Sequence, residues 1–239
     1  MPLTTVTPSA FRTLVPSEVL GRLTDVERKF APAVLHLAGD ASLLRQGPRV
    51  AVVGSRKASD EGLRRAAALT RALVKRDIVV VSGLAAGIDT AVHTAALEAG
   101  GRTIAVIGTP LDQSYPRENA ALQARLAQEQ LVVSQFDPGS TVRPNNFPIR
   151  NRTMALLTDA TVIVEAGEKS GTVNQGWEAL RLGRLLFLLE SVATDPALTW
   201  PKLMIHHGAQ VLSRGNLEAA LQDIPAITQF RPDELQAIA

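Results

Sequence analysis

The chain has 239 residues, of which 46% are hydrophobic, and a formal net charge of +2. This size and apolar content fit one large α/β domain with short appendages better than two equal domains. The chain contains no cysteine and only four histidines, which excludes disulfides and thiolate metal sites and argues against a structural zinc site. We therefore expect no bound metal, and a nucleic-acid site would have to come from a local group of basic residues.

The sequence shows neither the features of a signal peptide nor those of a membrane span. The segment 1–23 lacks the basic region and apolar stretch of a signal peptide, and no apolar run reaches the length of about 18 residues that a membrane span needs. We expect a protein without a membrane span that works in the cytoplasm.

Residues 1–47 contain Pro, Thr and short amphipathic stretches, which predict a helical N-terminal extension packed on the core. Residues 48–191 then alternate between short apolar runs and helical patterns. Strands are predicted at 49–55, 78–83, 103–108, 131–136, 160–166 and 184–190, and helices at 59–77, 87–101, 117–130, 147–159 and 171–183. The strand runs are rich in Val and Ile and continuous, as in parallel strands covered on both faces.

This regular alternation predicts an open, doubly wound, mostly parallel sheet, an extended Rossmann-like α/β fold. Residues 192–239, with a strand candidate at 209–213 and a helix candidate at 217–224, are expected to complete the same domain. Ligands of such sheets bind at the carboxyl ends of the strands, so the residues that follow each strand are the candidates for a site.

Glycine and serine follow several of the predicted strands where the next helix is about to begin, at Gly54, Ser55, Ser82, Gly83, Ser170 and Gly171. Glycine lets the backbone approach a ligand closely, and the first N–H groups of a helix favour a phosphate. Any one of these loops is explained equally well as a simple turn. Their repetition, with Arg56 and Lys169 beside the glycines, favours a phosphate site.

The segment FPIRNR, residues 147–152, carries two arginines separated by one residue. Residues at this spacing cannot share one helical face, so we expect at least one of Arg150 and Arg152 in the loop or first turn, where a guanidinium can fork onto phosphate oxygens. Phe147 can stack on a base, as aromatic side chains do in single-strand binding sites. The alternatives are an apolar plug for Phe147 and a solvated face for the arginines.

Two pairs of titratable residues are weaker candidates for a site. Asp89 and His93 stand four apart on one predicted helix, but an Asp near a helix start is more often a capping group, and His93 is expected to be structural. Glu165 and Glu178 provide two carboxylates for glycosidic-bond chemistry, without an obvious nucleophile.

Cofactor motifs are missing after the first predicted strand. The sequence there reads GSRKAS instead of the dinucleotide fingerprint G-x-G-x-x-G, and no Walker motif occurs. Both NAD binding and P-loop ATP hydrolysis are disfavoured, and we expect no cofactor.

The segments VAVVGSRKASDEG, VVSGLAAGIDTAVHTAALEAGGRTIAVIG, YPRENAAL, FPIRNR and IVEAGEKSGT follow one another within residues 33–190. Together they resemble the DprA/Smf family of DNA-processing proteins. The resemblance implies a non-enzymatic Rossmann-like protein that binds and protects single-stranded DNA and helps to load the RecA recombinase during natural transformation. It also implies a homodimer.

By the same resemblance, the DNA- and phosphate-binding residues are Gly54, Ser55, Arg56, Ser82, Gly83, Phe147, Arg150, Asn151, Arg152, Lys169, Ser170 and Gly171. Such contacts hold the backbone without reading the sequence of the DNA. The chain departs from the family pattern at Gln135, where the family usually has Glu, and residues 192–239 show no clear winged-helix pattern. We therefore expect a short or divergent member.

Two other functions stay open at this point. One is a nucleotide sensor that uses the same phosphate site. The other is a nucleoside-monophosphate phosphoribohydrolase-like enzyme, because GEKSGTVNQGWE is similar to the PGG-x-GT-x-x-E loop of the lysine-decarboxylase-like hydrolases. In this chain Gln175 stands where the catalytic glutamate of that loop belongs, and Glu178 lies too far along, which disfavours hydrolysis.

Overall fold

The structure is a computed structural model that describes residues 3–5 and 11–226. The strands of its main sheet are β2 (Phe11–Leu14), β3 (Leu35–Gly39), β4 (Arg49–Gly54), β5 (Val79–Ser82), β6 (Thr103–Val106), β8 (Leu131–Ser134), β9 (Ala160–Glu165), β10 (Leu185–Leu189) and β11 (Gln210–Leu212). Their order is β11-β10-β9-β4-β5-β6-β8-β3-β2. The strands from β11 to β8 are parallel, whereas β3 and β2 join antiparallel at one edge.

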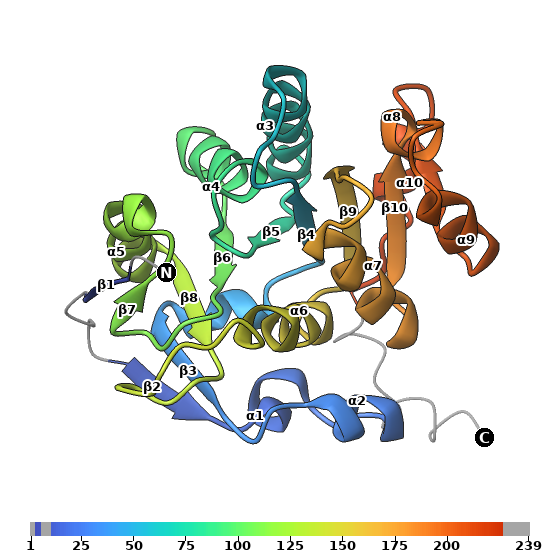
Figure 1. Cartoon of the computed structure of the whole chain (residues 1–239). Helices are drawn as coiled ribbons and strands as arrows, with labels where there is room; N and C mark the ends of the chain where they lie inside the picture. Colours follow the sequence, from blue (N-terminus) through green and yellow to red (C-terminus); the bar gives the residue numbers. More distant parts are fainter. Residues whose placement is uncertain (1–2, 6–10, 227–239) are drawn as a thin grey trace.

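Helices cover both faces of this sheet (Figure 1). They are α1 (Pro16–Leu20), α2 (Asp25–Phe30), α3 (Asp60–Val74), α4 (Ile88–Glu98), α5 (Ala120–Glu129), α6 (Asn146–Leu156), α7 (Gly171–Arg181), α8 (Glu190–Ala193), α9 (Trp200–His206) and α10 (Leu217–Gln222). None of the helices in the described residues is long and apolar enough to cross a bilayer. The predicted doubly wound, mostly parallel α/β fold is confirmed.

The continuous apolar runs follow from burial on both faces of the sheet. Along β4, Val50 and Val52 pack into the cluster under α3 and α4, whereas Ala51 and Val53 pack into the cluster under α6 and α9. Successive residues of a strand point to opposite faces, so a strand covered on both sides has no polar positions to alternate with.

The N-terminal segment differs from the predicted helical extension. It contains α1 and α2, but it also supplies β2 and β3 to the main sheet, where β3 pairs with β8 through the register His36↔Ser134. Residues after 192 supply β11, which pairs with β10. A smaller two-stranded sheet joins β1 (Thr4–Thr5) to β7 (Gln113–Ser114). Residues 1–47, 48–191 and 192–239, which the sequence analysis treats as three segments, therefore all contribute strands to one main sheet.

Local capping fixes the helix that follows β4. Ser59 is the N-cap of α3, and its Oγ accepts a hydrogen bond from the backbone N–H of Gly62 at 3.0 Å. The Glu165 carboxylate at the end of β9 accepts another from the backbone N–H of Ser59 at 2.9 Å. These contacts hold the start of α3 against β9, and with it the intervening loop at the carboxyl edge of the sheet.

Candidate nucleic-acid interface

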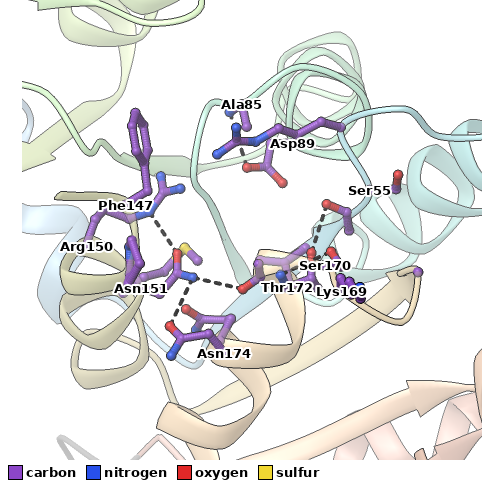
Figure 2. Close-up of a pocket in the computed structure, with 18 of the residues that line it drawn as sticks. Ser55, Ala85, Asp89, Phe147, Arg150, Asn151, Lys169, Ser170, Thr172 and Asn174 are labelled. Atoms are coloured by element: carbon purple, nitrogen blue, oxygen red, sulfur yellow. Dashed lines mark hydrogen bonds between the residues drawn. The ribbon is translucent and has the colours of Figure 1, made fainter. Parts of the chain in front are cut away.

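A pocket of about 780 Å³ opens at the carboxyl ends of β4 and β9, between the start of α4, α6 and the start of α7 (Figure 2). Many of the predicted site residues line it: Gly54, Ser55, Arg56, Phe147, Arg150, Asn151, Lys169, Ser170 and Gly171. Segments that are far apart in the sequence therefore meet at one edge of the sheet.

The loop after β4 forms one wall and is held by its neighbours. The backbone N–H of Ser55 donates to the Glu165 carbonyl at 2.7 Å, and the Thr172 hydroxyl donates to the Gly54 carbonyl at 3.0 Å. A Cβ on Gly54 would lie 2.5 Å from Cγ1 of Ile88. Glycine is thus required here by the close approach of α4, whether or not a ligand binds.

Arg150 forms the floor of the pocket and is buried. Its Nη1 donates to the carbonyls of Gly83 at 2.5 Å and Val106 at 2.6 Å, and its Nε donates to Asn151 Oδ1 at 3.1 Å. Burial lowers the pKa of Arg150 to about 10, and the nearby Asp89 carboxylate opposes that shift. Arg150 therefore stays charged at neutral pH and places a fixed positive charge beneath the site.

The mouth of the pocket carries the exposed cations Arg56, Lys57 and Lys169. No carboxylate in the described part of the chain forms an ion pair with any of these three side chains. Asp89 is the one acidic residue among those that line the pocket; it is buried and accepts from the backbone N–H of Ala85 at 3.2 Å. The pocket therefore presents an excess of positive charge to solvent.

An aromatic pair stands beside these cations. The ring centroids of Phe147 and Tyr115 are 5.2 Å apart, and the Arg56 guanidinium lies 5.3 Å from the centroid of the Phe147 ring. A Cβ on Gly108 would come within 2.7 Å of Cδ1 of Phe147, so the ring packs tightly against that turn. Phe147 is half-buried and lines the pocket, where Figure 2 shows it on the opposite side from Lys169.

An amide network joins α6 to the start of α7. Asn151 Nδ2 donates to the Gly171 carbonyl at 3.2 Å and to Asn174 Oδ1 at 3.4 Å (Figure 2). Ser170 caps α7, since its Oγ accepts from the backbone N–H of Thr172 at 3.2 Å. The network holds the N-terminal end of α7, with its partial positive charge, at the edge of the pocket.

Arg152 does not line the pocket. Its Nε lies 3.4 Å from Oε2 of the buried Glu178, and its guanidinium lies 5.1 Å from the ring centroid of Phe30. The expectation that Arg150 or Arg152 sits in a loop or first turn is wrong, because α6 begins at Asn146 and contains both beyond its first turn. A single helix therefore directs them to different surroundings.

Two further predicted residues support the pocket from beneath. Ser82 is fully buried, and its hydroxyl donates to the Val52 carbonyl at 2.7 Å. Gly83 lies under Arg150, where a Cβ would come within 2.3 Å of Nη1. Neither residue is among those that line the pocket.

The weaker candidates have structural surroundings. His93 is in the core, where its Nδ1 lies 2.8 Å from Thr103 Oγ1, and burial lowers its pKa to about 3, so the ring is neutral. Glu165 caps α3, and Glu178 pairs with arginines at the α6–α7 interface. Neither glutamate lines the pocket.

Several lining residues were missed by sequence reasoning: Lys57, Asp89, Tyr115, Thr172, Asn174 and Gln175. Lys57 directly follows Arg56, and the last three lie in the first turns of α7, so extending the loop motifs by a few residues would have found these four. Asp89 was predicted to be a capping group, in preference to an acid–base partner of His93, and not a residue of the phosphate site. Tyr115 comes from the segment between β6 and α5, and no local signal connects it to Phe147.

Known proteins with similar sequences include DNA-processing proteins. The chain is 38% identical over 200 residues to the DNA processing protein DprA of Streptococcus pneumoniae, covering 84% of this chain and 68% of that protein. It is 35% identical over 181 residues to DprA of Bacillus subtilis, covering 76% and 61%. The matched regions thus leave roughly a third or more of these longer relatives uncovered.

Two solved structures share the fold closely. DprA from S. pneumoniae matches with a TM-score of 0.76 and 36% identity, over 88% of this chain and 74% of that one. The structure of DNA processing protein A from Helicobacter pylori, which is described for its single-stranded DNA binding mode, matches with a TM-score of 0.74 and 27% identity, over 89% and 94%. The model of the family described as DNA recombination-mediator protein A matches residues 18–224. The chain therefore belongs to the DNA recombination-mediator protein A family, also known as the DprA/Smf DNA-processing proteins.

Proposed function

We propose that this protein binds single-stranded DNA through the pocket at the carboxyl ends of β4 and β9. The proposal depends on one pocket that holds Arg56, Lys57 and Lys169, none of them ion-paired within the described residues, together with Phe147, whose ring centroid lies 5.3 Å from the Arg56 guanidinium. Cations beside an aromatic ring are the usual means of holding a strand whose bases are unpaired. The H. pylori relative, described by its single-stranded DNA binding mode, supports the same ligand.

The roles of the residues follow from their chemistry. Lys57 and Lys169 are point charges suited to phosphate, and the planar guanidinium of Arg56 can fork onto two phosphate oxygens. The capped start of α7 adds backbone N–H groups with a favourable dipole. Phe147 offers a face to a base of any kind, so we expect binding without strong sequence preference.

The pocket fits hydrolysis of a nucleotide less well than binding of a DNA strand. It needs a carboxylate at the glycosidic bond, and Glu165 and Glu178 are both engaged outside the pocket. Asp89, the acidic residue that does line it, is buried beneath the cations. We propose a binding protein and not an enzyme.

We further propose that the protein protects the bound strand and helps to load a RecA-type recombinase onto it, as a cytoplasmic homodimer, in DNA recombination and transformation. The family description as a recombination mediator supports this role. The test is RecA filament formation on single-stranded DNA precoated with single-strand binding protein. Wild-type protein should accelerate it, and Lys169→Ala should accelerate it less.

The direct test of DNA binding is the affinity for a fluorescent oligo-dT of about sixteen nucleotides, measured by anisotropy over a series of salt concentrations. The logarithm of the affinity should fall linearly with the logarithm of the salt concentration, and Lys57→Ala or Lys169→Ala should each reduce the magnitude of that slope by about 0.7. Arg125→Ala, which removes an exposed cation on α5, is the matched control and should leave the slope unchanged.

Salt-insensitive or absent binding would contradict the proposal. Displacement of the oligo by nucleoside monophosphates at low concentration would instead favour the nucleotide-sensor alternative. Release of free base from those nucleotides would favour the hydrolase.

A further inference from the structure

A second group of cations lies around Phe30 at the end of α2. The charged groups of Lys29, Arg152 and Arg181 lie 5.6, 5.1 and 5.3 Å from the centroid of its ring. We call these four residues the Phe30 surface. It combines α2, α6 and α7, and no residue of it lines the pocket.

The charges of the Phe30 surface do not cancel. Arg152 and Arg181 share one carboxylate, that of the buried Glu178, each at 3.4 Å. Lys29 is exposed, and no acidic residue in the described ranges forms an ion pair with it. Three positive charges therefore face a single buried negative one, and the excess is available to an anion.

Packing of α2 does not by itself explain this excess. A buried ion pair already fixes α2 to the core, because Arg184 Nη2 donates to Glu27 Oε1 at 2.5 Å and both side chains are less than a tenth exposed. Arg152 and Phe30 add to that contact between α2 and α6. The exposed charged groups of Lys29 and Arg181 are therefore not needed to attach α2 to the core.

The interface between α6 and α7 connects the Phe30 surface to the pocket. Asn174 and Glu178 are four residues apart on one face of α7, where Asn174 meets Asn151 at the pocket and Glu178 meets Arg152. From Asn174 to Arg181 the rise along α7 is only about 10 Å. A chain of phosphates that begins in the pocket can therefore reach the Phe30 surface within a few nucleotides.

We infer that the Phe30 surface is a second contact site for the DNA strand after it leaves the pocket. This inference rests on the proposed function. Since cations surround the Phe30 ring, its role is to orient them, and the surface holds phosphates instead of stacking a base. The strand would run from the start of α7, along the α6–α7 interface, to Arg181 and Lys29.

Oligonucleotide length separates the two contacts. An oligo-dT of about four nucleotides fills the pocket alone, whereas one of about sixteen can reach both sites. The double variant Lys29→Ala/Arg181→Ala should bind the short oligo like wild type in calorimetric titrations. It should bind the long oligo several-fold more weakly, and the magnitude of the salt slope should fall by about 1.4.

The matched control is Arg71→Ala/Arg125→Ala, which removes two exposed cations from α3 and α5 and should change neither affinity. Lys169→Ala should weaken both oligos, so it reports on the pocket independently. A Lys29→Glu variant, changed at an exposed position, repeats the test where the double variant unfolds too readily.

Unchanged affinity of the double variant for the long oligo would overturn the inference and leave the Phe30 surface as an attachment of α2. An equal loss for both lengths would overturn it as well. If wild-type protein bound neither oligo, the proposed function itself would fail, which is a different result.

Discussion

Arg150 and Arg152, separated by one residue on α6, have no partner in common. Arg150 is buried beneath the pocket, where it donates to the carbonyls of Gly83 and Val106 at the ends of β5 and β6. Arg152 instead contacts Glu178 and Phe30. An α-helix rotates by about 100° per residue, so the two side chains point roughly 200° apart around the helix axis. The same short motif therefore serves the pocket with one arginine and the Phe30 surface with the other.

Arg150 is expected to matter for stability as well as for binding. Arg150→Met removes the donor of two buried carbonyls, those of Gly83 and Val106, and should lower the free energy of unfolding by about 1–3 kcal/mol. It should also weaken oligo-dT binding. Urea unfolding and anisotropy measure the two effects, and Lys169→Ala should show only the second. Wild-type stability in Arg150→Met would contradict the role of these bonds.

Gly83→Ala should act through Arg150. A Cβ at this position would lie 2.3 Å from Nη1 and 2.6 Å from Cζ, so the guanidinium would have to move. We expect reduced thermal stability, and the double variant with Arg150→Met should be little worse than the worse single variant, because both changes break the same contacts. Gly167→Ala, whose Cβ meets nothing within 4 Å, is the control. Simple additivity would argue against the coupling.

Substitutions of Phe147 distinguish stacking on a base from the role of an apolar plug. Phe147→Ala should weaken binding of oligo-dT by about 1–3 kcal/mol while leaving the salt slope nearly unchanged, because the lost contact is uncharged. Phe147→Leu keeps an apolar side chain without a ring face and should bind nearly as weakly as the alanine variant. Full recovery in Phe147→Leu would show that Phe147 is an apolar plug.

Asp89 should make stability depend on pH. Burial raises the pKa of its carboxyl above the ordinary value of 3.8, so the folded state binds this proton more tightly than the unfolded state. The Asp89 contribution to stability is therefore most favourable at low pH and declines as the pH rises from 3.8 through the folded pKa. Thermal unfolding of wild type against Asp89→Asn across this range should show a difference that shifts in favour of the asparagine variant as pH rises. A constant difference would contradict the prediction.

Sequence reasoning found the parts of the fold that depend on local pattern. Runs such as 78–83 and 160–166 are apolar throughout because both faces of their strands are covered, and this pattern predicted the parallel core. β2 and β3 were missed because β3 joins the main sheet through β8, which lies far along the chain at Leu131–Ser134. The residues before 48 gave no local sign of that pairing.

For the site, too, the sequence predicted what depends on local pattern and not what depends on contacts between distant segments. Gly54 ends β4, Ser55 follows it, and Lys169 lies in the loop after β9, so their convergence could be predicted from the topology of a parallel sheet. The direction of an arginine on α6 could not, because it depends on where the helix begins and on partners such as Phe30 and Glu178 from other segments.

The antiparallel pairing of β3 with β8 has a consequence for synthesis of the chain. β3 leaves the ribosome early, yet the strand it must join is made only after β4, β5 and β6. Until then β2 is the one neighbour in the main sheet with which β3 can pair, and an isolated pair of strands is marginally stable in water. The nascent N-terminal segment must therefore wait for the core, and a protein begun at β4 would leave the edge of β8 open to association with other chains.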